Sequence, residues 1–174
     1  MAVYTPSDDS YLLAEVLASR TCRRFLDMGC GAGIQAESIG HADEIICADI
    51  NREAVEEARA RVKRPNTKFV VSDLFGNING KFDLIAFNTP YLDDSEPRDI
   101  AWTHMQNGRD VIIRFMEEAK GHLEKDGAIL MVISDRGYSR YRTEAIRMGY
   151  TWEVVGEKAL FFEKIFAVEL RLRA

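Results

Sequence analysis

The sequence lacks long apolar runs and a basic, signal-like end, and each absence excludes a class of protein. No apolar stretch approaches the roughly 20 residues that a membrane-spanning helix needs. The N-terminal segment MAVYTPSDDS has no basic stretch followed by an apolar core, so no secretory signal is visible. We therefore expect a cytoplasmic protein that does not enter a membrane.

Cysteine and histidine are also sparse, with three of each. Cys22, Cys30 and Cys47 are an odd number and form no C-x-x-C pair, which argues against a disulfide framework and against a zinc site. Three small buried or half-buried thiols are the simplest interpretation. The histidines are scattered without ligand spacing, so no metal site is expected.

Positive charge is in the minority, because 23 Lys and Arg stand against 28 Asp and Glu and the net charge is −5. Such a surface does not favour the phosphates of free nucleic acid, although a local basic patch could still bind them. The balance therefore favours a protein or a small molecule as the substrate. Without repeats, low-complexity tracts or linkers, we expect residues 1–174 to form one domain that buries roughly 68–70% of its unfolded surface.

Strand-like and helix-like segments alternate along the chain, which is typical of a mostly parallel sheet covered on both faces. The expected strands are 23–28, 44–49, 67–73, 81–88 and 127–134, followed by an antiparallel pair at 151–159 and 161–173. The expected helices are 11–18, 34–39, 52–62, 108–122 and 138–149. In such sheets, ligands bind beyond the carboxyl ends of the strands, so the residues that follow the first four strands are the candidates for a site.

The first of these strand ends is a glycine-rich loop, Asp27-Met-Gly-Cys-Gly-Ala-Gly33. Glycines at 29, 31 and 33 let the backbone turn tightly and approach a ligand closely, although a purely structural turn is an alternative. A dinucleotide-binding G-x-G-x-x-G would need a third glycine where Ile34 stands. No lysine follows the loop to meet phosphates, so a nucleoside without phosphates fits better than a nucleotide triphosphate.

Carboxylates follow the second and third strands. Asp49 lies twenty residues beyond Gly29, where it could accept both ribose hydroxyls of a nucleoside or simply cap a helix. Ser72-Asp73-Leu74 follows the third strand, where a side-chain acceptor could hold an adenine amino group or serve as a turn residue.

This combination resembles the class I S-adenosylmethionine-dependent methyltransferases: D-x-G-x-G-x-G, an acid ending strand two and an Asp after strand three. The resemblance spans essentially the whole chain and implies a Rossmann-like, seven-stranded, mostly parallel sheet with an antiparallel last strand. It implies S-adenosyl-L-methionine as cofactor, with Asp27 and Gly29 at its methionine part, Asp49 at the ribose, and Asp73 with Leu74 at the adenine. The full set of expected cofactor contacts is Ser10, Asp27, Gly29, Gly31, Gly33, Asp49, Ile50, Asp73, Leu74 and Asn88.

The fourth strand ends on FNTPY, in which Asn88 is a poor strand former and Pro90 cannot donate to a ladder. N-P-P-Y at this place marks methyltransferases that modify planar amide or amino nitrogens. By that resemblance, the Asn88 oxygen and the carbonyl of residue 89 accept the two N–H bonds of the target nitrogen, and Tyr91 forms a wall. The expected catalytic residues are Asn88, Thr89, Pro90 and Tyr91. Thr89 replaces the first proline, which keeps the carbonyl and loses the stiffness of the ring.

Two further stretches resemble the short HemK-like group of release-factor glutamine methyltransferases, the archaeal and eukaryotic type. YTPSDDSYLL matches the opening Y-x-P-x-x-D-[ST]-x-L-L, in which the residue at Ser10 contacts the cofactor and residues 1–20 form a helical segment closing over it. WTHMQNGRDVIIRF resembles W-x-G-G-x-N-G-R-x-V-x-x-R-F, with His104-Met105 in place of the glycine pair. Taken alone, NGRDV could be only a helix start with Asp110 and Arg114 paired.

The resemblance implies N5-methylation of the glutamine in the Gly-Gly-Gln loop of a peptide-chain release factor. It also implies a small zinc-binding activator protein alongside the third strand, with Phe69 and Val71 (or Val70) facing outward. Two alternatives remain: an RNA or DNA amino-group methyltransferase built on the same site, and a catalytically silent relative that binds the cofactor only.

Overall fold

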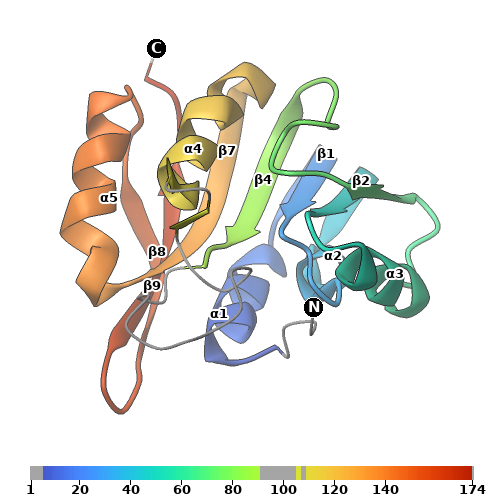
Figure 1. The fold of residues 1–174 in the computed structure, drawn as a ribbon, viewed down its shortest axis with the longest axis horizontal. Coiled ribbons are helices and arrows are strands. Elements are labelled where there is room, and N and C mark those ends of the chain that lie inside the picture. The colour runs from blue at the N-terminus through green and yellow to red at the C-terminus, as the bar shows by residue number, and fades with distance from the viewer. Residues whose placement is uncertain (1–5, 91–104, 107–108, 174) are drawn as a thin grey trace.

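The computed structural model in Figure 1 describes residues 6–90, 105–106 and 109–173. Seven strands form one sheet in the order β3-β2-β1-β4-β7-β9-β8. The first five in this order are parallel, and β9 runs antiparallel to both of its neighbours. The strands are β1 (Thr21–Met28), β2 (His41–Asp49), β3 (Thr67–Val71), β4 (Phe82–Asn88), β7 (Leu123–Ser134), β8 (Glu153–Ala159) and β9 (Lys164–Leu170). This is the mixed, mostly parallel sheet that the sequence predicts.

Helices cover both faces of the sheet (Figure 1). They are α1 (Asp8–Leu17), α2 (Ile34–Ser38), α3 (Arg52–Arg61), α4 (Val111–Ala119) and α5 (Asp135–Arg147). One apolar cluster joins the sheet to α1, α2 and α3 through side chains such as Leu13 and Ala58. A second cluster joins the other face to α4 and α5 through Phe115 and Tyr141. Burial on both faces explains why the last eight residues of β7 form an unbroken buried run.

The helix starts follow from local capping. The Asn51 side chain accepts the backbone N–H of Glu53 and begins α3. Asp110 accepts the N–H groups of Ile112 and Ile113 and begins α4. The expected start of this helix at Gly108 is therefore wrong, because Arg109–Asp110 (β6) pairs with Met105–Gln106 (β5), and Asp110, the last residue of β6, is itself the cap. After Ala119, the helix tightens into a 3₁₀ turn that ends at His122, the expected last residue.

The starts of β7 and α5 also differ from the prediction, and each difference involves a glycine. β7 begins at Leu123, four residues before Gly127, and a Cβ at Gly127 would lie 2.8 Å from the Phe82 carbonyl. Glycine there permits close strand contact instead of starting a strand. The helix α5 begins at Asp135 instead of Tyr138, with Gly137 inside its first turn.

The state of the cysteines and the presence of membrane-spanning helices can both be checked in the described residues. Cys22, Cys30 and Cys47 are free thiols, the first half-buried and the others buried, as expected. Among the described residues, no helix combines the length and the apolar character that a membrane crossing needs.

Candidate active site

The glycine loop after β1 is held against the end of β2. The Cys30 N–H donates to the Ala48 carbonyl at 3.0 Å, and the Gly31 N–H donates to Asp49 Oδ2 at 3.0 Å. Gly29, Gly31 and Gly33 all have positive φ, between 50° and 83°. A Cβ on Gly29 would also lie 2.9 Å from the Phe87 ring, so a side chain would be both strained and crowded there. The backbone is accessible at Gly29 and Gly31, whereas Gly33 is buried and a Cβ there would clash with the Val62 side chain, so its glycine serves packing against α3.

Asp27 is a fully buried carboxyl group at the end of β1. Its Oδ2 accepts the N–H of Ala36 at 3.1 Å, while Oδ1 is buried and has no partner within the described part of the chain. Burial raises the pKa of Asp27 to about 8, opposed by the Ala36 hydrogen bond and assisted by the charge of Asp49. Without a ligand the carboxyl is therefore mainly protonated at neutral pH, and a cationic or N–H-bearing ligand group beside Oδ1 would favour its charged form.

Asp49 holds the backbone on both sides of the site, although the cap of α3 is Asn51 and not Asp49. Oδ2 accepts from Gly31, and Oδ1 accepts the N–H of Asn51 at 2.8 Å, so the carboxylate does hold the backbone where α3 begins. Burial raises the pKa of Asp49, although the hydrogen bonds from Asn51, Gly31 and Ile50 oppose the rise. Ile50 beside it is 45% exposed, which leaves its side chain accessible to a ligand at Asp49.

Asp73 is joined to α4 by an interaction that sequence reasoning missed. Arg114 Nη2 lies 3.2 Å from both carboxylate oxygens of Asp73, and its side chain is only 15% exposed. The possible pairing of Arg114 with Asp110 is wrong, because Arg114 turns to Asp73 and Glu118 and Asp110 pairs with Arg140. Only the fold reveals this, since Asp73 and Arg114 lie 41 residues apart.

The turn that carries Asp73 is itself fixed. The Ser72 hydroxyl donates to the Leu74 carbonyl at 2.7 Å and accepts the Asn77 N–H at 2.9 Å. Leu74 has a positive φ of 45°, an uncommon conformation for a residue with a side chain. An uncommon backbone conformation in the turn after β3, next to the candidate site, is consistent with a functional turn.

Asn88 ends β4 with an amide whose orientation is determined by α1. The Ser10 hydroxyl donates to Asp9 Oδ1 at 3.2 Å, so its oxygen is left to accept the Asn88 Nδ2–H at 3.1 Å. The amide nitrogen therefore points at Ser10. Asn88 Oδ1 is buried and has no partner within the described residues, which leaves an acceptor for a ligand.

A buried glutamine of α2 also contacts Ser10 of α1, and the sequence did not predict this contact. Gln35, in the first turn of α2, donates Nε2–H to the Ser10 carbonyl at 3.1 Å. Its Oε1 is buried without a partner among the described residues. A five-residue helix is too short for periodicity to reveal which face is buried, so no sequence signal identified Gln35.

Thr89 has a role that the proline of the related motif cannot have. Its side chain is 4% exposed, and its hydroxyl donates to the Val132 carbonyl of β7. Half-buried Pro90 follows. The expected catalytic Tyr91 lies outside the described residues, as does His104.

Fold and site together define a class I methyltransferase-like α/β domain with buried polar groups at the carboxyl ends of β1 to β4. The model of the family "Methyltransferase small domain" matches residues 6–147, and the chain belongs to this family. A putative protein N5-glutamine methyltransferase of Methanocaldococcus jannaschii is 31% identical over 177 residues, covering 95% of this chain and 90% of that protein. Methyltransferase HEMK2 of Mus musculus is 32% identical over 152 residues, covering 75% of this chain and 71% of that protein.

The same fold is found in the Mtq2–Trm112 complex of E. cuniculi, described as responsible for methylating the translation termination factor eRF1. The match has a TM-score of 0.79 at 22% identity and covers 99% of this chain and 100% of that chain. The chain is a methyltransferase, and S-adenosylmethionine is its cofactor. The residues present fit that cofactor: an Asp27 oxygen without a partner in the described part of the chain, accessible backbone at Gly29 and Gly31, and a carboxylate at Asp49.

Proposed function

We propose that this enzyme N5-methylates the glutamine of the Gly-Gly-Gln loop of a peptide-chain release factor in the cytoplasm. The observation that carries the proposal is the Asn88 amide, whose nitrogen is held by Ser10 and whose buried oxygen is unpaired. The relative named a putative protein N5-glutamine methyltransferase supports a protein glutamine as the target, and the Mtq2–Trm112 structure, described as responsible for methylating eRF1, supports a termination factor as the substrate. The net charge of −5 counts against the alternative of a nucleic-acid substrate.

The amide nitrogen of glutamine is a weak nucleophile because its lone pair is delocalised into the carbonyl. Asn88 Oδ1 and the carbonyl of Thr89 would each accept one of its N–H bonds. Two fixed acceptors hold the nitrogen in one orientation and stabilise the positive charge that develops on it. The Asp9–Ser10–Asn88 chain of hydrogen bonds keeps the acceptor in place before the substrate arrives. The nitrogen becomes acidic once alkylated, and water can take the proton.

When bound, S-adenosylmethionine supplies an electrophilic methyl group on a positively charged sulfur. Asp27, with the loop of Gly29, Gly31 and Gly33, would hold its methionine part. Asp49 with Ile50 would hold the ribose, and Asp73 with Leu74 the adenine, while Ser10 and Asn88 would border the methyl group. Residues 1–174 would act as one methyltransferase domain, with residues 1–20 closing over the cofactor.

We also propose a small zinc-binding activator protein along β3. β3 is an edge strand of the sheet. Phe69 is half-buried beneath the Arg59 guanidinium, which lies 5.0 Å from its ring centroid, and Val70 is half-buried against the core on the other face. The apolar side chains are thus less open than expected. The outward-facing backbone of this edge strand would be the main binding element, with the Val71 carbonyl already bonded to the Asn77 side chain.

Mass spectrometry of a candidate release factor, after incubation with the enzyme and S-adenosylmethionine, tests the proposed function. We expect a 14-dalton gain on the Gly-Gly-Gln peptide, as one methyl group replaces one hydrogen. Asn88→Ala should lower turnover about a hundred- to a thousandfold, because one positioned acceptor is lost. Cofactor affinity measured by calorimetry should change far less. Methylation of RNA instead of the protein, or a near-normal rate in the variant, would contradict the proposal.

A further inference from the structure

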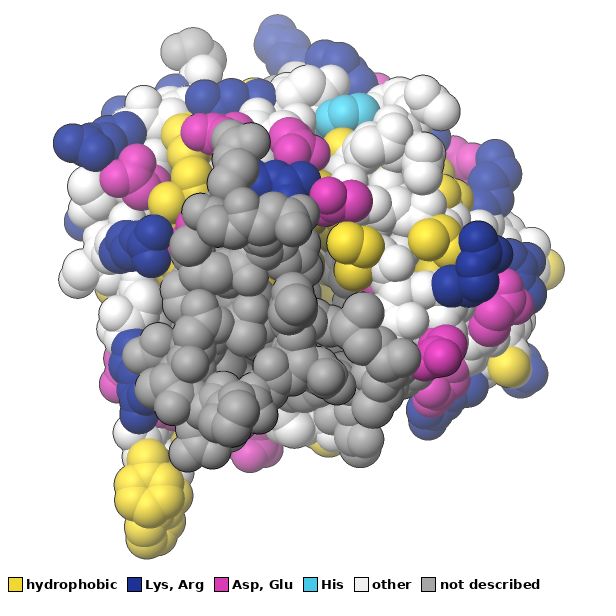
Figure 2. All heavy atoms as spheres, in the orientation of Figure 1, with side chains coloured by type: hydrophobic (Ala, Val, Ile, Leu, Met, Phe, Trp, Pro, Cys, Tyr) yellow, Lys and Arg dark blue, Asp and Glu magenta, His cyan; other side chains and the backbone are white. Residues whose placement is uncertain are grey.

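The most exposed large apolar side chains of the described chain are two adjacent phenylalanines at one hairpin tip. Phe161 is 92% exposed and Phe162 is 86% exposed, and their rings lie edge to face with centroids 4.8 Å apart. Figure 2 shows apolar side chains projecting from the molecule where Figure 1 places the end of the β8–β9 hairpin. Burying such a side chain typically stabilises a protein by about 1.5–3 kcal/mol, and neither of these contributes in that way.

Turn chemistry does not explain them either. The chain reverses at Phe161-Phe162, where the Leu160 N–H donates to the Glu163 carbonyl at 2.8 Å. Asn, Asp and Gly are the residues that tight hairpin turns favour, because they accept positive φ or bond to their own backbone. Phe-Phe has neither property and adds an aggregation hazard. Neither the fold nor the turn thus accounts for the pair.

The tip lies at the same edge of the sheet as Asn88. β9 is antiparallel to both β7 and β8, so β8 runs parallel to β7 and β4 and ends at their carboxyl edge. Ser134 at the end of β7 pairs with Ile165, and the hairpin continues past this point to its tip. A protein that presents a glutamine to Asn88 must cover this edge, and the tip would meet its surface.

The helix that orients Asn88 also braces the hairpin. Asp8, in the first turn of α1, pairs with Lys158 of β8 at 2.7 Å. Gly156 lets α1 approach closely, since a Cβ there would lie 3.2 Å from Leu12. Ser10 of the same helix accepts the Asn88 amide. The β8–β9 hairpin and the reactive amide are therefore both in contact with the same helix, α1.

We infer that Phe161 and Phe162 are a docking element for the protein substrate, inserting into an apolar pocket of the folded release factor beside its glutamine loop. This inference rests on the proposed function. An activator on β3 cannot be the occupant, because β3 and β8 are opposite edges of the sheet. Two phenylalanines bury about 300–500 Å². That area is too small for a dimer of this chain through the tip alone, where about 1,200 Å² is needed, and ample for the centre of a larger interface.

The test compares intact release factor with a short peptide containing the Gly-Gly-Gln loop. In Phe161→Ser/Phe162→Ser, we expect the Kd for intact release factor, by calorimetry, to rise at least tenfold and kcat/KM to fall by a similar factor. The kcat at saturation, methylation of the peptide and cofactor affinity should stay unchanged. Val154→Ser, which removes a 39% exposed apolar side chain on the same hairpin, is the matched control and should behave as the native enzyme. Phe161→Leu/Phe162→Leu should recover most of the affinity.

Different failures have different meanings. Unchanged affinity for intact release factor in the serine variant overturns the docking element and leaves the proposed function standing. An equal loss on peptide and intact factor also overturns it, because the effect would then lie in the active site. If the native enzyme methylates neither substrate, the proposed function fails, and unchanged binding in the variant still decides the docking element separately. Loss of binding to anionic lipid vesicles, with release-factor affinity unchanged, would assign the pair to a membrane surface and overturn the inference.

Discussion

At the scale of single residues, the buried carboxyl group of Asp27 lowers the stability of the fold when it is charged, at a position proposed to bind the cofactor. Its carboxyl has a pKa of about 8 in the folded protein because it is buried, against about 3.9 in an unfolded chain. The folded state therefore binds more protons between these values, and the unfolding free energy falls as pH rises from about 4 to 8. Above pH 8, the group is ionised in both states and its cost is constant.

Asp27→Asn should therefore be more stable than the native protein at pH 8 and about equally stable at pH 4. The asparagine oxygen can still accept the Ala36 N–H, so the change removes mainly the buried charge. Urea unfolding of both proteins at the two pH values measures the difference. The variant should also bind S-adenosylmethionine less tightly. A stability difference that does not depend on pH would show that Asp27 titrates normally.

Thr89 offers a second residue-scale prediction, because its hydroxyl donates to the Val132 carbonyl and can replace the rigidity of a proline ring. Thr89→Ser keeps this donor and should methylate at near-native rates. Thr89→Val keeps the shape and leaves the buried carbonyl without its hydroxyl partner, which should cost about 1–3 kcal/mol of stability and lower kcat. Thr89→Pro restores a fixed φ, and its methylation rate should lie between the rates of the serine and valine variants or above both. Single-turnover methylation ranks the variants, and equal rates for Ser and Val would remove the hydroxyl from the mechanism.

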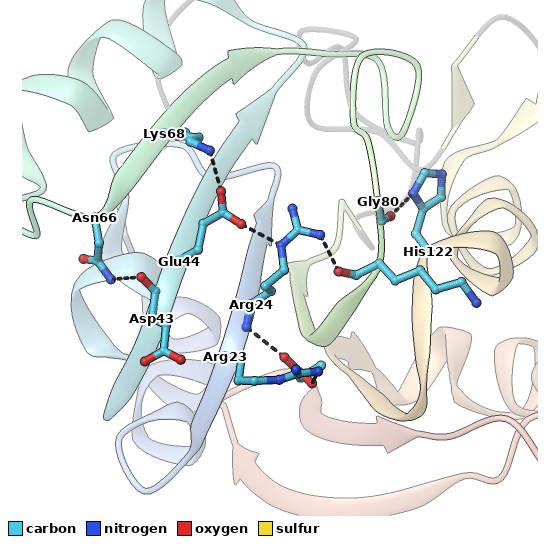
Figure 3. A network of polar contacts seen from close by, with 10 residues as sticks. Arg23, Arg24, Asp43, Glu44, Asn66, Lys68, Gly80 and His122 are labelled. Atoms are coloured by element: carbon cyan, nitrogen blue, oxygen red, sulfur yellow. Dashed lines mark hydrogen bonds and ion pairs between the residues drawn. The ribbon is translucent and has the colours of Figure 1, made fainter.

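At the scale of elements, three neighbouring strands are joined by charge at one end of the sheet. Glu44 of β2 accepts from Arg24 of β1 at 2.6 Å and from Lys68 of β3 at 2.5 Å, as Figure 3 shows. The hydrogen bonds from Lys68 and Arg24 lower the pKa of Glu44. Its contribution is therefore present above the unfolded pKa of about 4.3 and is lost as pH falls through the lower folded value.

Glu44→Gln should lower the unfolding free energy at pH 7 by about 0.5–1 kcal/mol, as expected for a partly exposed network. The difference from the native protein should shrink in 1 M salt and disappear near pH 2. Thermal unfolding of both proteins at pH 7, in 1 M salt and near pH 2 measures this stability difference. Glu56→Gln, on exposed α3, removes an ion pair with Arg59 and is the control, with no measurable loss. An unchanged difference at low pH would mean that Glu44 acts through packing.

The elements show which features a sequence can predict. Strands such as β4 and β7 are recognisable because they are buried on both faces and read as apolar runs. The expected start of the last strand at Phe161 is wrong, since β9 begins at Lys164, and the short β5–β6 pair was not predicted. Candidate residues at strand ends follow from topology, because parallel strands align their carboxyl ends. Gln35, the Asp73–Arg114 contact and the Thr89 hydroxyl bond were not predicted, since each depends on packing between segments distant in sequence.

At the scale of the whole molecule, the two edges of the sheet present different binding groups: apolar side chains at one edge and backbone groups at the other. β8 leads to the phenylalanine tip, and β3 ends the sheet on the other side. The Ile45 N–H donates to the Asn66 carbonyl, and the Ser72 N–H donates to the Asp49 carbonyl. Because bonding alternates along a parallel strand, even-numbered residues of this stretch bond to β2, while Phe69 and Val71 point their backbone N–H and C=O groups outward. The Val71 carbonyl already accepts Asn77 Nδ2–H at 2.9 Å, so the outward N–H of Val71 is the group to test.

This alternation allows the activator edge to be tested without breaking the sheet. Val71→Pro removes an outward N–H and leaves the bonds to β2, whereas Val71→Ala removes only the side chain. If the proposed activator adds a strand to β3, the native protein and Val71→Ala should gain solubility and methylation rate from it. Val71→Pro should gain neither, while keeping a native far-UV circular dichroism spectrum. Co-purification and the methylation assay measure both effects. A fully active, well-behaved isolated chain with no gain from the activator would show that this edge is not a binding surface, and the docking of release factor would then depend on the carboxyl edge alone.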